Sequence, residues 1–139
     1  GLVRLGMSDR IASRLASTLS LPAGGQGAVG IECRTDDGAI RELLAPLHDP
    51  DTASCVLSER ALNRHLQGGC QVPIACFAEL DDKGKTLGLR GLVGSIDGTT
   101  ILRSEIEGPR ENAEALGIEL AEQLLAQGAG EILAEVYNR

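Results

Sequence analysis

The length of 139 residues suits one domain, or one domain together with a piece of another. The formal net charge is −7 and the only aromatic residues are Phe77 and Tyr137, which argues against phosphate-backbone binding and against base stacking on single-stranded nucleic acid. We therefore expect no nucleic acid as partner. No apolar run reaches membrane-spanning length, so we also expect no membrane as partner.

Residues 1–49 are not expected to fold by themselves. Along this part the sequence predicts a helix over about 8–19, a loop rich in Gly and Pro over 21–27, a buried strand over 28–33 and a helix over about 36–47. Two helices cannot cover both faces of a single strand or pair with its edges. We therefore expect the other strands of that sheet to lie in sequence outside this chain.

Residues 50–139 show a pattern that is complete in itself. Short turns rich in Asp and Gly separate three strand-like runs, which predicts an antiparallel meander. The fold class is therefore α+β, with a three-stranded antiparallel sheet and about three helices on one of its faces. The predicted elements are a helix from Asp51 or Thr52 to about Gln67, strands over 73–80, 86–94 and 99–107, and helices over about 110–127 and 129–136.

The four cysteines do not form a metal-binding pattern. They include no CxxC pair, and neither His48 nor His65 lies at zinc-finger spacing from them, so we expect no metal site. Their number and the chain length favour a reduced, cytoplasmic protein over a disulfide-bonded secreted module. Three of the cysteines are expected to be core residues, namely Cys33, Cys55 and Cys76.

Cys70 differs from the other cysteines because it follows Gly68 and Gly69 at a corner between a helix and a strand. A thiol at such a corner is open to covalent chemistry. His65 lies near the end of the preceding helix, where it is expected to face solvent or cap the helix, and the helix dipole there disfavours a thiolate. This environment argues against a repeatedly used nucleophile. It still allows a single alkylation by a strong electrophile.

Two further features have both a functional and a bland interpretation. Arg60 and Arg64 share one helix face, either as an anion clamp near Cys70 or as surface residues paired with Glu59 and other acids. The segment 24–30 is rich in Gly but lacks the Lys-Ser/Thr of a phosphate-binding loop and precedes a strand. It is better explained as a hinge whose backbone amides approach a ligand.

Three motifs, in this order, resemble the porphobilinogen deaminase (hydroxymethylbilane synthase) family, and the resemblance covers essentially the whole chain. The closing residues 131–137 also resemble the C-terminus of its bacterial members. The motifs are Leu21-Pro22-Ala23-Gly24-Gly25-Gln26-Gly27-Ala28-Val29-Gly30-Ile31-Glu32-Cys33-Arg34, Ser58-Glu59-Arg60-Ala61-Leu62, and Leu66-Gln67-Gly68-Gly69-Cys70-Gln71-Val72-Pro73-Ile74.

The resemblance implies a function in tetrapyrrole (heme) biosynthesis. Members condense four porphobilinogen units into hydroxymethylbilane on a dipyrromethane cofactor, which a cysteine matching Cys70 holds through a thioether. By the same resemblance the cofactor would also contact Gln26, Gly27, Ala28 and Arg60, and Arg4 would bind the substrate. The acetate and propionate groups of the growing oligopyrrole chain suit such arginines.

The resemblance also predicts how the chain is divided. Residues 1–49 would be the tail of the second domain, the hinge and a crossover into the first, and residues 50–139 would be the C-terminal cofactor-attachment domain. The catalytic aspartate of the family has no counterpart here, so no catalytic residue is expected in this chain. We expect a C-terminal piece that is inactive without the N-terminal part of the same protein, and a full-length enzyme that is a monomer.

Two other functions are compatible with the residues alone. One is a non-catalytic α+β regulatory or interaction module with a free surface thiol. The other is a thiol-based redox enzyme, which would require a low pKa at Cys70. Replacing Cys70 by Ser would leave ligand content unchanged in the first case and abolish cofactor attachment in the deaminase.

Overall fold

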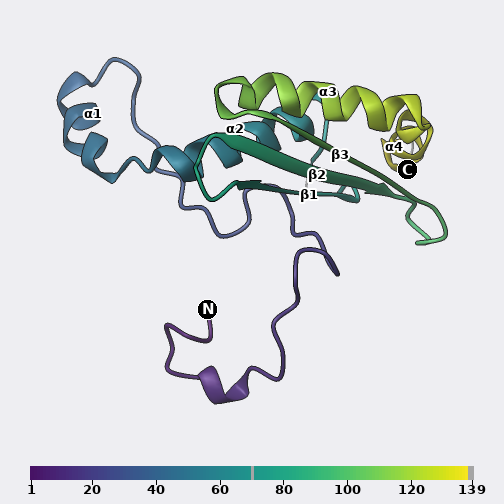
Figure 1. Cartoon of the computed structure of the whole chain (residues 1–139), viewed down its shortest axis with the longest axis horizontal. Coiled ribbons are helices and arrows are strands. Elements are labelled where there is room, and N and C mark those ends of the chain that lie inside the picture. Colours follow the sequence, from purple (N-terminus) through teal and green to yellow (C-terminus); the bar gives the residue numbers. More distant parts are fainter. Residues whose placement is uncertain (70, 138–139) are drawn as a thin grey trace.

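The structure is a computed structural model that describes residues 1–69 and 71–137. Apart from three short 3-10 turns, its elements are helices and one sheet (Figure 1). In chain order they are α1 (Gly38–Leu44), α2 (Pro50–His65), β1 (Ile74–Leu80), β2 (Thr86–Gly94), β3 (Ile101–Pro109), α3 (Ala113–Ala126) and α4 (Ala129–Tyr137). No helix in these described ranges is both long and apolar enough to cross a membrane.

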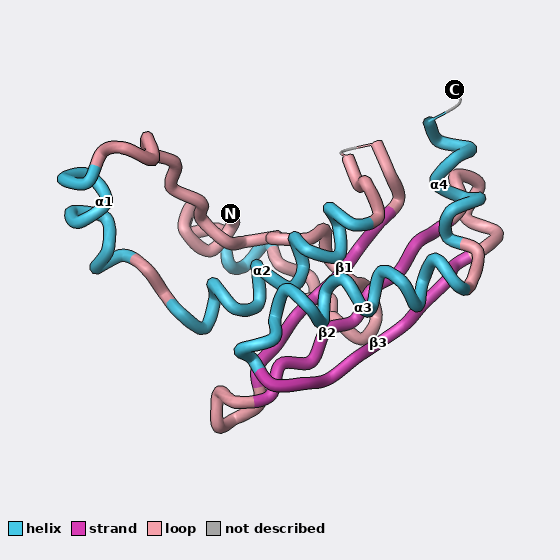
Figure 2. Tube along the Cα trace, turned by 90° about the horizontal axis from the view of Figure 1, so that it is seen from above, coloured by secondary structure: helices cyan, strands magenta, loops and turns pink. Residues whose placement is uncertain are grey.

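The sheet is an antiparallel meander in the order β1-β2-β3, as the turn residues predicted. Gly84 and Gly98 adopt left-handed backbone angles (φ +65° and +72°) in the two hairpin connections, a conformation that glycine adopts without strain. Because side chains alternate along a strand, every second residue of β2 points to the same face of the sheet. Helices α2 and α3 cover that face (Figure 2). The prediction of an α+β fold with its helices on one face of a three-stranded sheet is confirmed.

The core lies between this sheet face and the two long helices. Leucines from β2, α2 and α3 meet there with no exposed surface, and burial of this kind contributes about 1.5–3 kcal/mol per side chain. Gly117 of α3 lies against α2 so closely that a Cβ atom would overlap the carbonyl oxygen of Ser58. The helices consequently pack with their backbones near each other. The fully buried leucines are Leu62, Leu87, Leu89, Leu120 and Leu124.

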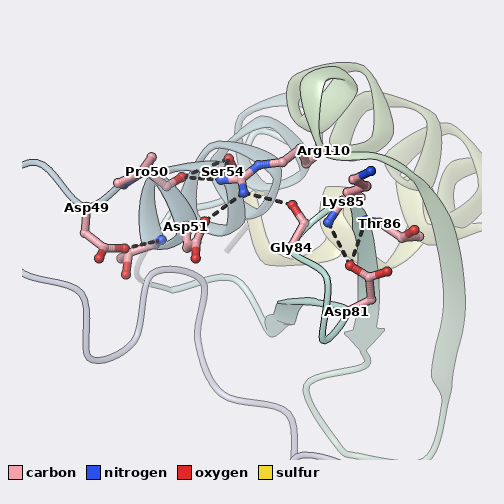
Figure 3. A network of polar contacts seen from close by, with 10 residues as sticks. Asp49, Pro50, Asp51, Ser54, Asp81, Gly84, Lys85, Thr86 and Arg110 are labelled. Atoms are coloured by element: carbon pink, nitrogen blue, oxygen red, sulfur yellow. Dashed lines mark hydrogen bonds and ion pairs between the residues drawn. The ribbon is translucent and has the colours of Figure 1, made fainter.

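The start of α2 is fixed by a network around Arg110 (Figure 3). The Asp49 side chain caps the helix by accepting a hydrogen bond from the Thr52 amide (2.7 Å). The Arg110 guanidinium donates to Asp51 (2.7 Å), to two further groups of α2, and to the carbonyl of Gly84 in the β1–β2 hairpin (2.9 Å). One arginine therefore joins the first turn of α2, the hairpin and the entry to α3.

Of the four elements predicted for residues 1–49, two are wrong, and the loop over 21–27 and the helix over about 36–47 are confirmed. Only a 3-10 turn at Ser8–Arg10 forms where a helix over 8–19 was expected. Residues 28–33 form no strand and are exposed, so Cys33 is not a core residue. Both segments lack an apolar surface to pack on, and no described strand lies beside 28–33 to pair with it. The expected helix over about 36–47 is present as α1 and a following 3-10 turn.

Candidate functional site

Residues 21–30, here called the Gly-rich segment, cross the edge of the sheet beside β1. The carbonyl oxygen of Pro22 accepts a hydrogen bond from the amide of Cys76 (3.0 Å), so the segment occupies part of an edge that would otherwise be open. Gln26, Gly27 and Ala28 follow at an exposed turn. There they line an open hollow of about 600 Å³ between the first half of α2 and the second half of β1.

Glu59 of α2 joins this segment to the sheet. One carboxylate oxygen accepts a hydrogen bond from the Gly25 amide (2.6 Å) and the other accepts one from the Ala78 amide of β1 (2.8 Å). Glu59 is only 6% exposed, and burying a carboxylate without hydrogen-bond partners is costly. Both oxygens therefore use charge-assisted bonds to backbone amides.

The thiols near Glu59 are poor nucleophiles. Burial, with a smaller contribution from the Glu59 carboxylate, raises the pKa of Cys76 to about 12. The same two causes raise the pKa of Cys55, which is half-buried against the core. Because the thiolate is the reactive form, both residues are structural cysteines, as the sequence predicted.

The hollow beside the Gly-rich segment is acidic. Carboxylates of α2 and of the β1–β2 hairpin line it together with the backbone of the segment. This lining would repel a ligand that bears acetate and propionate groups. The acidic lining residues are Asp51, Glu59, Asp81 and Asp82.

Hydrogen bonds join the start of the loop after α2, as far as Gly68, to α2 and α4. The Asn63 side chain donates to the carbonyl of Gly68 (3.2 Å), and the Gly68 amide donates to the carbonyl of Asn63 (2.7 Å). Gln67 takes a left-handed backbone angle (φ +55°), and its carbonyl accepts a hydrogen bond from the Tyr137 hydroxyl of α4. Cys70, the predicted attachment residue, lies outside the described residues.

The predicted arginines are not gathered into one cluster. Arg60 is exposed on α2 directly after Glu59, and none of the ion pairs in the described part of the chain involves it. Arg64 instead lies 3.7 Å from Glu114 of α3, which agrees with the bland interpretation for this residue. Arg4 belongs to the exposed N-terminal segment over residues 1–10, which Figure 1 shows well away from the sheet.

His65 is partly exposed, and its ring pairs with the Glu122 carboxylate of α3. Within the described ranges, no group of three or more His, Cys, Asp or Glu side chains is placed to hold a metal ion.

Sequence reasoning had noted Glu59 only as a possible ion-pair partner of the arginines. A signal for its burial existed. Glu59 lies four residues after Cys55 and three before Leu62, on the same helix face as these core residues. A charged residue in that register requires polar partners inside the fold.

Two family models match this chain. The model described as porphobilinogen deaminase, C-terminal domain, matches residues 53–126, which is more than half of the chain. The model described as porphobilinogen deaminase, dipyromethane cofactor binding domain, matches residues 1–42. The two matches follow each other without overlap and confirm the resemblance found in the sequence. The chain therefore belongs to the porphobilinogen deaminase family.

Proposed function

We propose that Cys70 holds the dipyrromethane cofactor of this family through a thioether, and that the chain acts as the C-terminal part of a hydroxymethylbilane synthase. The supporting observation is the arrangement of the thiols. Cys55 is partly buried and Cys76 is buried, both with raised pKa values, whereas the loop before Cys70 is joined to the end of α2 by the hydrogen bond from Asn63 to Gly68. A group attached there would have a defined starting point.

The neighbouring residues suit a ligand that bears carboxylates. Arg60 lies five residues before the end of α2 and offers a guanidinium that forms no ion pair within the described residues. In the Gly-rich turn the amides of Gln26 and Ala28 donate to Ala23 and Gly25 (3.0 and 3.1 Å), which leaves the amide of Gly27 as the donor at the rim. On this basis we assign Arg60 and Gly27 to cofactor contact, and we assign Gln26 and Ala28 to it by the family resemblance.

The bound dipyrromethane would supply the pyrrole to which porphobilinogen units are joined with loss of ammonia. The residues of this chain would hold it in place and pair with its acidic substituents. The thiol itself need react only once, so this role requires no base poised for repeated use. Arg4 is assigned to the substrate, porphobilinogen or the growing chain, by the resemblance alone.

We further propose that residues 1–49 belong to the two preceding domains and residues 50–139 to the cofactor-attachment domain. Every buried side chain in the described structure lies at residue 58 or later, and apolar residues of the first part such as Leu15, Leu19 and Val29 are largely exposed. They would pack against an N-terminal part of the same protein. We assign the whole enzyme to the cytoplasm as a monomer, in keeping with its free cysteines Cys33, Cys55 and Cys76.

The test is reconstitution of this chain with a separately produced N-terminal part of a porphobilinogen deaminase, here called the reconstituted enzyme. We expect it to consume porphobilinogen and to give an Ehrlich colour reaction for bound dipyrrole. Cys70→Ser should abolish both signals. Cys33→Ser, which alters the exposed cysteine, is the matched control and should retain both. Full activity of the Cys70→Ser variant would contradict the assignment.

A further inference from the structure

We propose that Glu59 is a positioning residue of the enzyme: its carboxylate sets the place of the Gly-rich turn relative to the loop that carries Cys70. We call the carboxylate with its hydrogen bonds to the Gly25 and Ala78 amides the Glu59 bridge. The assignment rests on the proposed function, because it concerns how the turn and the attachment loop act together.

The first argument is that the Glu59 bridge joins parts of the chain that are far apart in sequence. Gly25 lies 34 residues before Glu59, and Ala78 lies 19 residues after it. The two bonds therefore connect the segment matched by the cofactor-domain model with the segment matched by the C-terminal model. A single side chain spans the boundary between these two parts.

The second argument is that the connected elements flank the attachment loop. Helix α2 leads into residues 66–73 and β1 leads out of them. The turn is tied to α2 and β1 by Glu59 and a second time to β1 by the bond from the Cys76 amide to the Pro22 carbonyl (3.0 Å). The position of the turn is thus fixed relative to both ends of the loop.

The third argument is that the contact depends on a carboxylate and on close packing. Both groups that donate to Glu59 are backbone amides. A neutral amide side chain in its place would accept from only one of them and would turn its own N–H toward the other. A Cβ atom on Gly24 would lie 3.0 Å from the Cys76 sulfur, so the segment already touches the edge of β1. Glu59→Gln keeps the size and removes one acceptor, so it should release the turn while leaving the helix intact.

The first experiment measures amide exchange by NMR in the intact chain. In the wild-type chain Gly25 should exchange slowly although it lies in an open turn, and Gly27, two residues later, should exchange rapidly. Glu59→Gln should accelerate exchange at Gly25 about tenfold or more, relative to the central amide of Leu89 in β2. Glu119→Gln, on the exposed face of α3, is the control and should change neither. Equal exchange at Gly25 and Gly27 in the wild type would overturn the Glu59 bridge.

The second experiment uses the reconstituted enzyme. Glu59→Gln should raise the KM for porphobilinogen about tenfold while the peptide containing Cys70 keeps its adduct, because the turn is misplaced but the thioether is not broken. A purely structural role would reduce the active fraction and leave KM unchanged, and that result would overturn the positioning role. If the wild type consumed no porphobilinogen, the proposed function would fail, whereas the exchange rates would still decide on the Glu59 bridge.

Discussion

The contact between α2 and α3 at Gly117 can be tested by adding a single methyl group. In an ordinary helix Gly→Ala stabilises by about 1 kcal/mol, because alanine loses less backbone freedom on folding. At Gly117 the new Cβ atom would overlap the Ser58 carbonyl oxygen and lie 2.7 Å from the Ala61 Cβ atom and 2.9 Å from the Leu62 amide nitrogen. All three neighbours belong to α2, and two of them are backbone atoms that cannot rotate away.

Relief of this overlap requires the helices to separate by about 1 Å, which forfeits a quarter to a half of each direct contact across the interface. Leu62 and Leu120, which have no exposed surface, lie in that interface. Overpacking of this kind costs about 1–3 kcal/mol, and backbone overlap places Gly117→Ala at the upper end. After subtraction of the helix propensity gain, we expect a net loss of about 2 kcal/mol, or roughly 10 °C in melting temperature.

The assay is thermal and urea unfolding followed by circular dichroism. The matched control is Gly130→Ala in α4, where a Cβ atom would meet only Leu125 at 3.8 Å, an ordinary contact. This control should be neutral or slightly stabilising. A Gly117→Ala variant as stable as the wild type would show that α2 and α3 do not approach each other as described, and the reasoning would fail.

Three further predictions follow from other parts of the structure. Arg110→Met removes the hydrogen bonds that join α2 to the hairpin and should lower the urea midpoint by an amount equivalent to about 2 kcal/mol; an unchanged midpoint would contradict the network. The amides of Thr86 and Lys85 lower the pKa of Asp81, so its stabilising effect is present above the ordinary value of 3.8 and is lost as pH falls through the lower folded pKa. Asp81→Asn should therefore flatten the acid limb of the stability curve, and an unaltered limb would count against this. Iodoacetamide should label the native chain at Cys33 and spare Cys76 until it unfolds, and rapid native labelling of Cys76 would contradict its burial.

The C-terminal part of the fold could be predicted from sequence because its interactions are local or repeat with a clear period. Turn residues around Gly84 and Gly98 defined the hairpins, and Leu116, Leu120 and Leu124 defined the buried stripe of α3. These signals agree with each other, which is the condition under which pattern reasoning succeeds.

The prediction of a buried strand in the N-terminal part was wrong for a physical reason. The apolar pattern of residues 28–33 indicates a buried strand, but a strand requires neighbours to pair with and a surface to cover it. Neither lies beside this segment in the described structure, so residues such as Val29 remain exposed. The apolar pattern indicates that this segment packs against a partner, and the described residues do not include one.

The candidate site was predicted in its motifs but not in its connections. Gln26, Gly27 and Arg60 were predicted because their motifs resemble a family, whereas the proposed role of Glu59 depends on two bonds to residues 34 and 19 positions away. Sequence spacing gives no access to such distant pairs. The sequence indicated that polar partners exist only through the helix register of Glu59, which places a charged residue on the same face as Cys55.

The most direct test of the account is a peptide mass map of the reconstituted enzyme after tryptic digestion. Cleavage after Arg64 and Lys83 yields one peptide that contains both Cys70 and Cys76. The account predicts that this peptide carries the added mass of a dipyrrole and that fragmentation assigns the addition to Cys70. An unmodified peptide from an enzyme that consumes porphobilinogen, or an adduct assigned to Cys76 or to Cys33, would contradict it.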